Sequence, residues 1–384
     1  MRPLRAFPLD GSPESLDDLV LALTAALDGS GPAIVPGASS VPADEVPDEV
    51  AVVISTSGST GRPKHVMLSA AALTASARAT EERLGGPARW TLALPLDHVA
   101  GVQVVLRALL AGAPPVLQDV REGFRPAGFA RATGRLPHGA RRYTSLVPTQ
   151  LGRILDSVDG PGSAALYALA GYDAVLIGGA ALPPALRERA EAAGIRVVTT
   201  YGMSETCGGC VYDGLPLAGV EAHVAPDGRL SLAGPVLATG YLGDPALTAE
   251  AFVDGRFVTG DLGRWVDGRL VVLGRADDMI VTGGEKVAPA AVERVLAAQP
   301  GVAAACVVGV PDPEWGQAVA AAIVPTGAGP DLDGLRAAVR AAEGRAAVPR
   351  RMRLVPELPL RGVGKPDRAA VAVLLDRVGD APIR

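Results

Sequence analysis

The chain has 384 residues, of which 48% are hydrophobic and 20% are charged, so it is long and apolar enough for two or three domains with a large core. Its formal net charge of −5 provides no basic face for a nucleic-acid backbone, so we expect no nucleic-acid partner. The 47 glycines and 33 prolines amount to about a fifth of the chain, which is below the fraction typical of disordered sequences.

The cysteines predict neither a disulfide framework nor a zinc site. Cys207 and Cys210 form a C-x-x-C pair, Cys306 is the third cysteine, and His223 is the histidine nearest to the pair. A structural zinc site needs four ligands at paired spacing. Cys207 and Cys210 could still form a redox-active pair, although the sequence around them does not resemble that of thioredoxin. We favour the interpretation that they are two small apolar residues in the wall of a pocket.

The sequence shows no targeting or membrane segment. The first residues are basic, but acidic residues between Asp10 and Asp18 follow, and no apolar segment separates the two groups. The uncharged run at residues 315–330 is interrupted by proline and glycine and is too short to span a bilayer. We therefore expect a soluble, cytoplasmic protein without stable membrane insertion.

Strand-like and helix-like segments alternate between residues 51 and 200. We expect strands at 51–55, 91–94, 143–147, 173–177 and 195–200, and helices at 69–84, 101–110, 149–157 and 183–193. This alternation predicts an α/β fold with layered, mostly parallel sheets, whose ligands bind at the carboxyl ends of the strands. The loops expected at those ends are 56–64, 94–101, 177–180 and 201–205.

The pattern changes after residue 220. Asp-Gly pairs at 227–228, 254–255 and 267–268 predict hairpins, so residues 220–275 form a small β subdomain of an N-terminal domain that spans residues 1–275. The short polar segment 276–278 has the composition of a hinge. Residues 279–384 predict a small, mobile α+β domain with helices at 289–298 and 332–342 and strands at 302–310, 318–324 and 351–355.

The segment TSGSTGRPK, from Thr56 to Lys64, directly follows an apolar strand. A loop of Gly, Ser and Thr can turn several backbone N–H groups toward one point, and Lys64 adds a cation, so the loop suits a polyphosphate. It is not a P-loop of the Gly-Lys-Ser/Thr kind, because Lys64 lies between Pro63 and His65. Taken alone, the segment is equally consistent with a polar surface linker.

Later segments add groups that suit a nucleotide. Tyr201 offers a ring for adenine, Ser204 a hydroxyl, and Glu205 a carboxylate of the kind that Mg²⁺ prefers. Asp261 can accept hydrogen bonds from ribose hydroxyls, and Lys365 lies in a glycine-rich segment ahead of a predicted helix. Each of these also has an ordinary structural interpretation as a turn or surface residue. Lysines are few in this arginine-rich chain, which favours a function for each: Lys64, Lys286 and Lys365.

Considered together, these motifs resemble those of the adenylate-forming superfamily of acyl- and aryl-CoA synthetases, luciferases and peptide-synthetase adenylation domains. The resemblance covers residues from about 50 to 370 and rests on TSGSTGRPK, LPLDHVAG, YGMSET, TGDLGRW, GRADDMIVTGGEKVAPAAVE and GVGKPDR, in the order of the family. It implies a two-step reaction. ATP and a carboxylate give an acyl-adenylate and pyrophosphate, and a thiol then attacks the activated carbonyl and releases AMP.

The resemblance also implies roles for individual residues. The ATP-binding residues would be Thr56, Ser57, Gly58, Ser59, Thr60, Gly61, Lys64, Gly178, Gly179, Ala180, Thr200, Tyr201, Gly202, Ser204, Asp261 and Arg275. Glu205, with Thr60, would bind Mg²⁺. The catalytic residues would be Lys365, Glu205 and His98, with Lys365 bridging the carboxylate and the α-phosphate.

The C-terminal domain would rotate about Asp277 between the two half-reactions, as the resemblance implies. Rotation would remove Lys365 and bring Gly283 and Gly284 to the CoA tunnel. The implied cofactors and substrates are ATP, Mg²⁺, CoA and a carboxylic acid, and a homodimer is implied by analogy alone.

Within the superfamily, the chain looks most like the short actinobacterial o-succinylbenzoate–CoA ligases of menaquinone biosynthesis. The likeness rests on residues 143–151, 201–214 and 94–101. The implied acid-binding residues are His98, Ser145, Thr149, Gly179, Cys207, Gly208 and Gly209. Ser145 and Thr149 could instead cap a helix near Pro148. Arg107 and Arg142 are cationic candidates for the second carboxylate.

Three alternatives remain at this point. A ligase for another aryl or acyl acid would carry out the same two-step reaction with a different acid-binding pocket. An adenylation enzyme that loads a carrier protein would change the acceptor, and no carrier serine motif follows residue 370 in this chain. A non-catalytic ATP sensor would not need Glu205 and Lys365.

Overall fold

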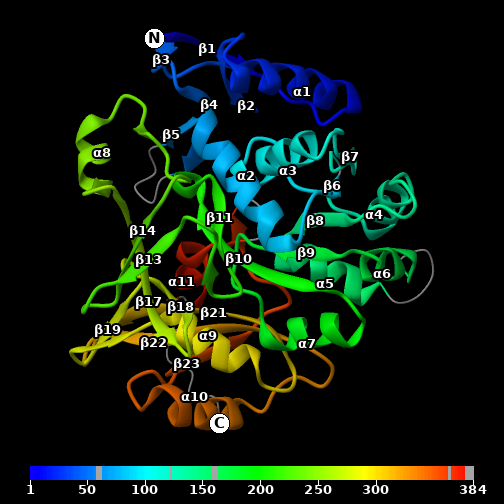
Figure 1. The fold of residues 1–384 in the computed structure, drawn as a ribbon. Coiled ribbons are helices and arrows are strands. Elements are labelled where there is room, and N and C mark those ends of the chain that lie inside the picture. The colour runs from blue at the N-terminus through cyan, green and yellow to red at the C-terminus, as the bar shows by residue number, and fades with distance from the viewer. Residues whose placement is uncertain (58–62, 122, 158–162, 362–364, 377–384) are drawn as a thin grey trace. The chain divides into compact units, whose positions relative to one another are not determined.

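The computed structural model describes residues 1–57, 63–121, 123–157, 163–361 and 365–376 (Figure 1). The chain divides into two compact units. Unit 1 comprises Met1–Gly179, Arg189–His223 and Ser231–Thr259, and unit 2 comprises Ala180–Glu188, Val224–Leu230 and the described residues from Gly260 onward. The chain passes between the units within α7 (Pro184–Ala192), β13 (Glu221–Val224), β14 (Arg229–Ala233) and β17 (Arg256–Val266).

The first sheet of unit 1 contains strands from both ends of that unit. Within the described residues its order is β15-β5-β4-β2-β1-β3. The pairs β1–β2 and β2–β4 are parallel, whereas β4–β5 and β5–β15 are antiparallel. The bounds are β1 (Arg2–Phe7), β2 (Ala33–Pro36), β3 (Glu45–Val46), β4 (Val50–Ser57), β5 (Pro63–Ser69) and β15 (Gly240–Tyr241).

The second sheet of unit 1 has the order β12-β11-β10-β9-β8-β6-β7. Strands β7, β6, β8, β9 and β10 are parallel, and β11 and β12 are antiparallel additions. The bounds are β6 (Arg89–Leu92), β7 (Val116–Leu117), β8 (Arg142–Leu146), β9 (Ala174–Ile177), β10 (Val197–Met203), β11 (Gly208–Tyr212) and β12 (Leu215–Pro216). The four residues of β9 are all buried, as expected for a strand with both faces covered.

Helix α2 (Ala70–Leu84) lies between the two sheets, because it contacts β4 and β5 of the first and β11 of the second. It begins where the Ser69 hydroxyl accepts a hydrogen bond from the amide of Ala72, and it ends at Gly85 in the left-handed conformation. In Figure 1, α2 and α3 lie on one side of β8 and β9, and α5 and α6 lie on the other. The remaining helices of unit 1 are α1 (Pro13–Asp28), α3 (Val99–Leu110), α4 (Pro126–Thr133), α5 (Pro148–Asp156), α6 (Ser163–Ala170) and α8 (Pro245–Ala251), with a 3₁₀ turn η2 at Ser204–Thr206.

Unit 2 is built on a twisted sheet of order β20-β19-β22-β21, with β23 parallel to β22. Its strands are β19 (Ile280–Thr282), β20 (Glu285–Val287), β21 (Val302–Asp312), β22 (Gly316–Pro325) and β23 (Arg351–Leu354), and its helices are α9 (Pro289–Ala297), α10 (Leu332–Glu343) and α11 (Arg368–Asp376). Two hairpins complete it: β17 with β18 (Arg269–Arg275), and β24 (Leu360–Arg361) with β25 (Lys365–Pro366).

Both faces of this sheet are covered. Val307 on β21 packs with Val292 of α9 and Val339 of α10, whereas Val308, the next residue, packs with Val371 of α11. Successive side chains of a strand point to opposite faces. This explains why β21 and β22 read as continuous apolar runs rather than alternating ones.

The structure confirms the expected helices and strands between 69 and 200 and after 289, with small shifts at their ends. The expected hairpin turns are also present, and Asp254 and Asp267 have positive φ, each followed by glycine with positive φ, as two-residue hairpins require. The strands from residue 50 onward belong to more than one sheet, as the expected layered sheets require, because β4 lies in a different sheet from β6, β8, β9 and β10.

Two further expectations need correction. Thr56 and Ser57 belong to β4, and the chain returns as β5 rather than passing through a loop into a helix. Residues 201–203 are also not a loop, since β10 continues to Met203 by pairing with β11. Residues 2–46, for which no elements were expected, contain β1, α1, β2 and β3. The strands concerned pair with partners that the sequence does not reveal, namely β4 with β5 and β10 with β11.

Candidate active site

The hairpin β4–β5 presents the phosphate-binding segment predicted from the sequence. Thr56 pairs with Lys64, and the Thr56 hydroxyl donates to the Lys64 carbonyl at 3.4 Å. The Lys64 Nζ lies 5.3 Å from the centre of the Tyr241 ring. The predicted residues Gly58, Ser59, Thr60 and Gly61 lie outside the described residues. The structure therefore places Thr56 and Lys64 opposite each other near the tip of a hairpin.

The segment from Tyr201 to Glu205 lies at the end of β10. Gly202 is required there, because a Cβ would come 2.1 Å from the Gly208 carbonyl oxygen across the β10–β11 pair. The Thr206 hydroxyl accepts from the Met203 amide at 2.9 Å and closes the turn. Ser204 is 8% exposed, and Glu205 is half-buried.

Glu205 is held at both its main chain and its side chain. Its carbonyl accepts from the Ala238 amide at 2.8 Å, and its Oε1 accepts from the Tyr241 hydroxyl at 2.8 Å. The described residues include no group of three or more His, Cys, Asp or Glu that could enclose a metal. A single carboxylate fits Mg²⁺ of the nucleotide-bound kind, which takes one or two carboxylates together with substrate phosphates.

The carboxyl ends of β8, β9 and β10 meet at one edge of the second sheet. Ser145 pairs with Leu176, and Ile177 pairs with both Leu146 and Thr199. Gly178 and Thr200 therefore follow at this edge. A Cβ on Gly178 would lie 2.4 Å from Thr200 Oγ1, and Gly179 has a φ of 81°, so both positions favour glycine. Gly179 ends unit 1, and Ala180 begins the first segment of unit 2.

The predicted acid-binding hydroxyls lie near this edge. Ser145 is 8% exposed within β8, whereas Thr149 is exposed in the first turn of α5. The capping role considered for them belongs to Gln150. Its Oε1 accepts from the Val147 amide at 3.0 Å, and its Nε2 donates to the Ala93 carbonyl at 2.8 Å. Capping therefore does not account for Ser145 and Thr149, and their predicted role stays a prediction.

His98 begins α3 at the end of the 94–98 loop. Its side chain is 50% exposed and its Nε2 lies 3.9 Å from Asp97 Oδ1. Gly101, one turn later, packs so closely that a Cβ would come 2.0 Å from the Pro95 carbonyl oxygen. The loop thus folds tightly over the first turn of the helix and leaves the imidazole accessible.

Cys207 and Cys210 are both fully buried free thiols. Burial raises the pKa of Cys207 well above its usual range and that of Cys210 to about 12. A protonated, enclosed thiol is a poor nucleophile. Gly208 is also buried, and a Cβ on Gly209 would meet Thr200 and the Tyr212 ring at 3.0 and 3.1 Å. These small residues thus allow β11 to pack closely.

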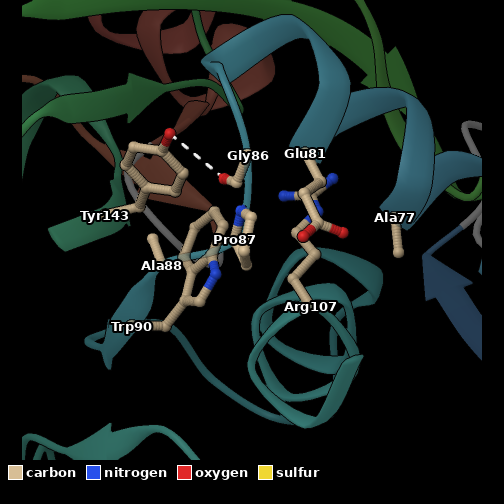
Figure 2. Close-up of a pocket in the computed structure, with 8 residues that line it drawn as sticks. All are labelled: Ala77, Glu81, Gly86, Pro87, Ala88, Trp90, Arg107 and Tyr143. Carbon is tan, nitrogen blue, oxygen red and sulfur yellow. Dashed lines mark hydrogen bonds between the residues drawn. The ribbon is translucent and has the colours of Figure 1, made fainter. Parts of the chain in front are cut away.

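The two arginines considered for the second carboxylate, Arg107 and Arg142, do not lie at the carboxyl ends of the strands. Arg142 is the first residue of β8 and pairs with Arg89, the first residue of β6, so both lie at the amino ends of the strands. The Arg107 guanidinium lies 5.6 Å from the Trp90 ring (Figure 2). It lines a cavity of about 10 Å³ together with Ala77, Glu81, Gly86, Pro87, Ala88, Trp90 and Tyr143. This cavity has room for about one water molecule.

Unit 2 contains the predicted ribose-binding pair. Asp261 on β17 pairs with Arg275 on β18, and Arg275 Nη1 lies 3.9 Å from Asp261 Oδ1. The Arg275 Nη2 donates to Asp277 at 3.0 Å. Gly260 makes room for the guanidinium, since a Cβ there would lie 2.6 Å from it. Arg275 thus contacts both the predicted ribose-binding carboxylate and the predicted hinge residue.

The predicted CoA-binding glycines form the turn between β19 and β20. The Gly283 amide donates to the Trp315 carbonyl at 3.0 Å, and a Cβ on Gly283 would lie 2.4 Å from the Trp315 ring. The Arg350 guanidinium lies 4.4 Å from the centre of that ring, and the buried Trp315 Nε1 has no partner among the described residues. Sequence reasoning missed Trp315 and Arg350, which are distant from the glycines in the chain.

Lys365 begins β25, and its neighbour Arg368 begins α11. Arg368 binds Glu293 of α9 at 2.6 and 3.0 Å, donates to the Val307 carbonyl at 2.6 Å, and lies 3.3 Å from Asp278. Partial burial lowers the pKa of Arg368, but the hydrogen bonds to Glu293 together with the nearby charges of Glu293 and Asp278 raise it overall above its usual range. Sequence reasoning missed this arginine, which joins the start of α11 to α9, β21 and Asp278.

Comparison with known proteins shows the family. Residues 10–242 match the family described as AMP-binding enzyme, and residues 291–365 match the AMP-binding enzyme C-terminal domain. The chain belongs to this family. It is 47% identical over 369 residues to a probable 2-succinylbenzoate–CoA ligase of Mycobacterium tuberculosis, covering 92% of this chain and 94% of that protein.

Solved structures agree with this assignment. The chain is similar to amide bond synthetase McbA from Marinactinospora thermotolerans, with a TM-score of 0.76, 28% identity, and coverage of 97% of this chain and 79% of that one. It is also similar to o-succinylbenzoate CoA synthetase MenE from Bacillus subtilis in complex with the acyl-adenylate intermediate OSB-AMP. That likeness has a TM-score of 0.71 and 25% identity and covers 92% of this chain and 80% of the other.

The predicted membership of the adenylate-forming superfamily, the fold class and the enzymatic class are confirmed. No helix in the described part of the chain combines the length and apolar character needed to cross a membrane. The roles of single residues, the domain limits and the hinge at 276–278 stay predictions.

Proposed function

We propose that the protein is an AMP-forming acid–thiol ligase that adenylates 2-succinylbenzoate with ATP and transfers the acyl group to CoA, as in menaquinone biosynthesis. The geometric observation that carries this proposal is the placement of a cation and a carboxylate around Tyr241. Lys64 lies over its ring and Glu205 accepts from its hydroxyl. A cation and a magnesium-binding carboxylate on neighbouring elements suit the polyphosphate of a nucleotide.

The first half-reaction joins a carboxylate to the α-phosphorus of ATP. A carboxylate oxygen attacks the phosphorus, the bond to the bridging oxygen of the β-phosphate breaks, and pyrophosphate leaves. Mg²⁺, when bound, would offset phosphate charge. Thr56 and Lys64 would hold the outer phosphates, Tyr201 and the glycines at 178–179 the adenine, and Asp261 with Arg275 the ribose.

Lys365 would act in this step, since two anions must approach each other. At about 4 Å, two unit charges repel by roughly 4 kcal/mol at an effective dielectric of 20. An ammonium between them reverses the sign of this contribution. His98 would exclude water from the acid.

The second half-reaction transfers the acyl group. The CoA sulfur attacks the acyl carbonyl carbon, the bond to the phosphate oxygen breaks, and AMP leaves. We assign the CoA side to Gly283 and Gly284 together with Trp315 and Arg350. The tight turn brings the backbone close to the exposed surface, and the guanidinium provides a cation for an anionic ligand.

The identity to the Mycobacterium relative over nearly the whole of both chains supports 2-succinylbenzoate as the acid. Ser145 and Thr149 would contact the carboxylate that does not react. Arg107 and Arg142 are withdrawn from this role, because Arg142 begins β8 and the Arg107 guanidinium of α3 lies over the ring of Trp90, the second residue of β6. We also propose a cytoplasmic location, where ATP and CoA are available, and a homodimer.

A screen of carboxylic acids tests the function. The purified protein is incubated with ATP, Mg²⁺ and each acid, with and without CoA, and AMP, pyrophosphate and thioester are measured. We expect 2-succinylbenzoate to give thioester far faster than benzoate, cinnamate or a fatty acid. Pyrophosphate release with another acid would change the substrate, and product formed with an amine rather than CoA would favour the chemistry named for McbA. No AMP with any acid would refute the ligase assignment.

A further inference from the structure

Tyr241 lies where three parts of unit 1 meet, and no motif identified from the sequence includes it. It is the second residue of β15, which pairs antiparallel with β5 so that Tyr241 is opposite Val66. The amides of Thr239 and Leu242 on either side donate to the carbonyls of Met67 and His65. Tyr241 is therefore fixed directly beside the strand that begins with the phosphate-binding segment.

The hydroxyl of Tyr241 donates to Glu205 Oε1 at 2.8 Å. The same glutamate is held at its main chain by Ala238, three residues before the tyrosine. A hydrogen bond at one carboxylate oxygen fixes the rotation of the group and directs the other oxygen. Loss of a group that orients a metal ligand in this way typically lowers metal affinity by about 10–100-fold.

The ring of Tyr241 contacts a group of the opposite charge. Lys64 Nζ lies 5.3 Å from the ring centre, within the range of a cation–π interaction. The negative face of the ring attracts the ammonium, and the positive hydrogen of the hydroxyl binds the carboxylate. One side chain thus contacts both groups that we assign to the phosphates and their metal.

The tyrosine itself has little freedom to move. It is 4% exposed, its amide donates to Thr248 Oγ1 at 2.9 Å, and its ring packs edge-on against Phe252 at 5.9 Å. The preceding Gly240 leaves no room for a side chain, because a Cβ would lie 2.5 Å from a Thr248 carbon. A rigid support is what an orienting residue requires.

We propose that Tyr241 is a positioning residue that aligns Glu205 for the magnesium ion and Lys64 for the phosphates of the bound nucleotide. The inference rests on the proposed ATP-dependent function. It goes beyond that function by assigning the alignment of two nucleotide-binding groups to one buried side chain.

The variant Tyr241→Phe tests the hydroxyl, because it retains the ring, its packing and the contact with Lys64. ATP binding is measured by calorimetry without any acid, with and without Mg²⁺. We expect the gain in ATP affinity on adding Mg²⁺ to fall about tenfold, as is typical when an orienting partner of a metal ligand is lost. Affinity for ATP without Mg²⁺ should stay at the wild-type value.

Tyr172→Phe is the matched control. Tyr172 is also buried in unit 1, and its hydroxyl bonds to Thr91 and Thr133 at 2.6 and 2.8 Å. This variant loses comparable hydrogen bonds and should lose thermal stability, yet retain the Mg²⁺ dependence of ATP binding. An equal loss of Mg²⁺ dependence in both variants would mean that only general stability is affected, and would overturn the proposal.

Tyr241→Leu tests the ring. It should also weaken ATP binding without Mg²⁺, because Lys64 loses its support, whereas Tyr241→Phe should not. Wild-type binding by Tyr241→Phe in both conditions would overturn the inference, even if Tyr241→Leu does not fold. Failure of the proposed function is distinguishable, since the wild-type protein would then give no AMP with any acid.

Discussion

The surroundings of individual side chains in this protein depend on contacts with residues that are distant in the sequence. Glu205 is a predicted magnesium ligand from the motif to which it belongs, but the Tyr241 hydroxyl that donates to it lies 36 residues further along the chain. Arg107 and Arg142 seemed suitable for a second carboxylate because of their charge. In the structure Arg142 begins β8, and the Arg107 guanidinium lies over Trp90 near the start of β6, so both lie away from the carboxyl ends of the strands. The sequence thus shows which residues are charged, but it does not show where in the fold they lie.

Replacing Lys365 by alanine should slow adenylation about 100-fold or more, because the repulsion between carboxylate and phosphate would no longer be offset. Thioester formation from acyl-adenylate supplied directly should stay near the wild-type rate. Pyrophosphate release and thioester formation, measured separately, check this expectation. Arg340→Ala, which removes an exposed cation of α10 in the same unit, should leave pyrophosphate release unchanged. An equal loss of both half-reactions in Lys365→Ala would contradict the assignment.

The buried cysteines should be unreactive in the folded protein. Burial raises the pKa of Cys210 and of Cys306 to about 12, and that of Cys207 still further, so the thiols stay protonated at neutral and mildly alkaline pH. An alkylating reagent at about pH 8 should label none of the three before denaturation and all of them after it. Rapid labelling of native Cys207 or Cys210, detected by mass spectrometry, would revive the redox interpretation.

The raised pKa of Cys210 also makes the stability of the protein depend on pH. In the unfolded chain the Cys210 thiol ionises near its ordinary pKa of 9.0, whereas in the folded protein it stays protonated to about 12. Its contribution to stability is therefore complete below 9 and is lost as pH rises from 9 toward 12. Chemical denaturation should give a smaller alkaline loss of unfolding free energy in Cys210→Ala than in the wild type. Equal losses in the two proteins would contradict the shift.

Hairpins and helix ends show how far local sequence specifies an element. Ser69 and Gly85 specify the start and the end of helix α2. The Asp-Gly turns lie where the sequence predicts them. The pairing of β5 with β4 was missed, because residues 58–62 between the two strands, which lie outside the described residues, have the composition of a loop. The extension of β10 was missed for a related reason, since Gly202 seems unsuited to a strand until β11 approaches it.

Gly202→Ala should disrupt the β10–β11 pair, because the added carbon would lie 2.1 Å from the Gly208 carbonyl oxygen. We expect the free energy of unfolding to fall by about 2 kcal/mol or more, with weaker ATP binding, since Tyr201 and Glu205 flank the site. Gly134→Ala is the control. Its φ of −62° and ordinary contacts accept alanine, so its stability should be unchanged or rise by about 0.4–1 kcal/mol. Equal stabilities of the two variants would refute the steric argument.

The division of the predicted roles between two compact units is the main feature of the molecule. Among the described residues, unit 1 holds those assigned to phosphate, metal and acid, and unit 2 holds those assigned to ribose, hinge and CoA together with the predicted catalytic lysine. Arg275 joins Asp277 to the strand of Asp261, and Arg368, which begins α11, contacts Asp278 and Glu293 of α9. Within unit 2, these contacts link the predicted hinge region to the helix that begins three residues after Lys365.

Asp277→Pro should trap one arrangement by fixing a backbone angle at the predicted hinge. We expect pyrophosphate release to continue and thioester formation to fall. Asp277→Asn removes the charge that pairs with Arg275 but leaves the backbone free, so both half-reactions should persist. Time-resolved pyrophosphate release compared with thioester formation provides the measurement. Loss of pyrophosphate release alone in the proline variant would refute the hinge assignment.

The chemistry of the protein and most of its local elements follow from the sequence, because apolar periodicity, turn residues and short motifs act over a few neighbouring positions. Three features do not follow from the sequence. They are the grouping of the strands into separate sheets, the position of Arg107 and Arg142 away from the predicted site, and the contacts of Tyr241 with Lys64 and Glu205. They depend on which distant strands pair and on which end of each strand a residue falls, and those choices are made by packing of the whole chain.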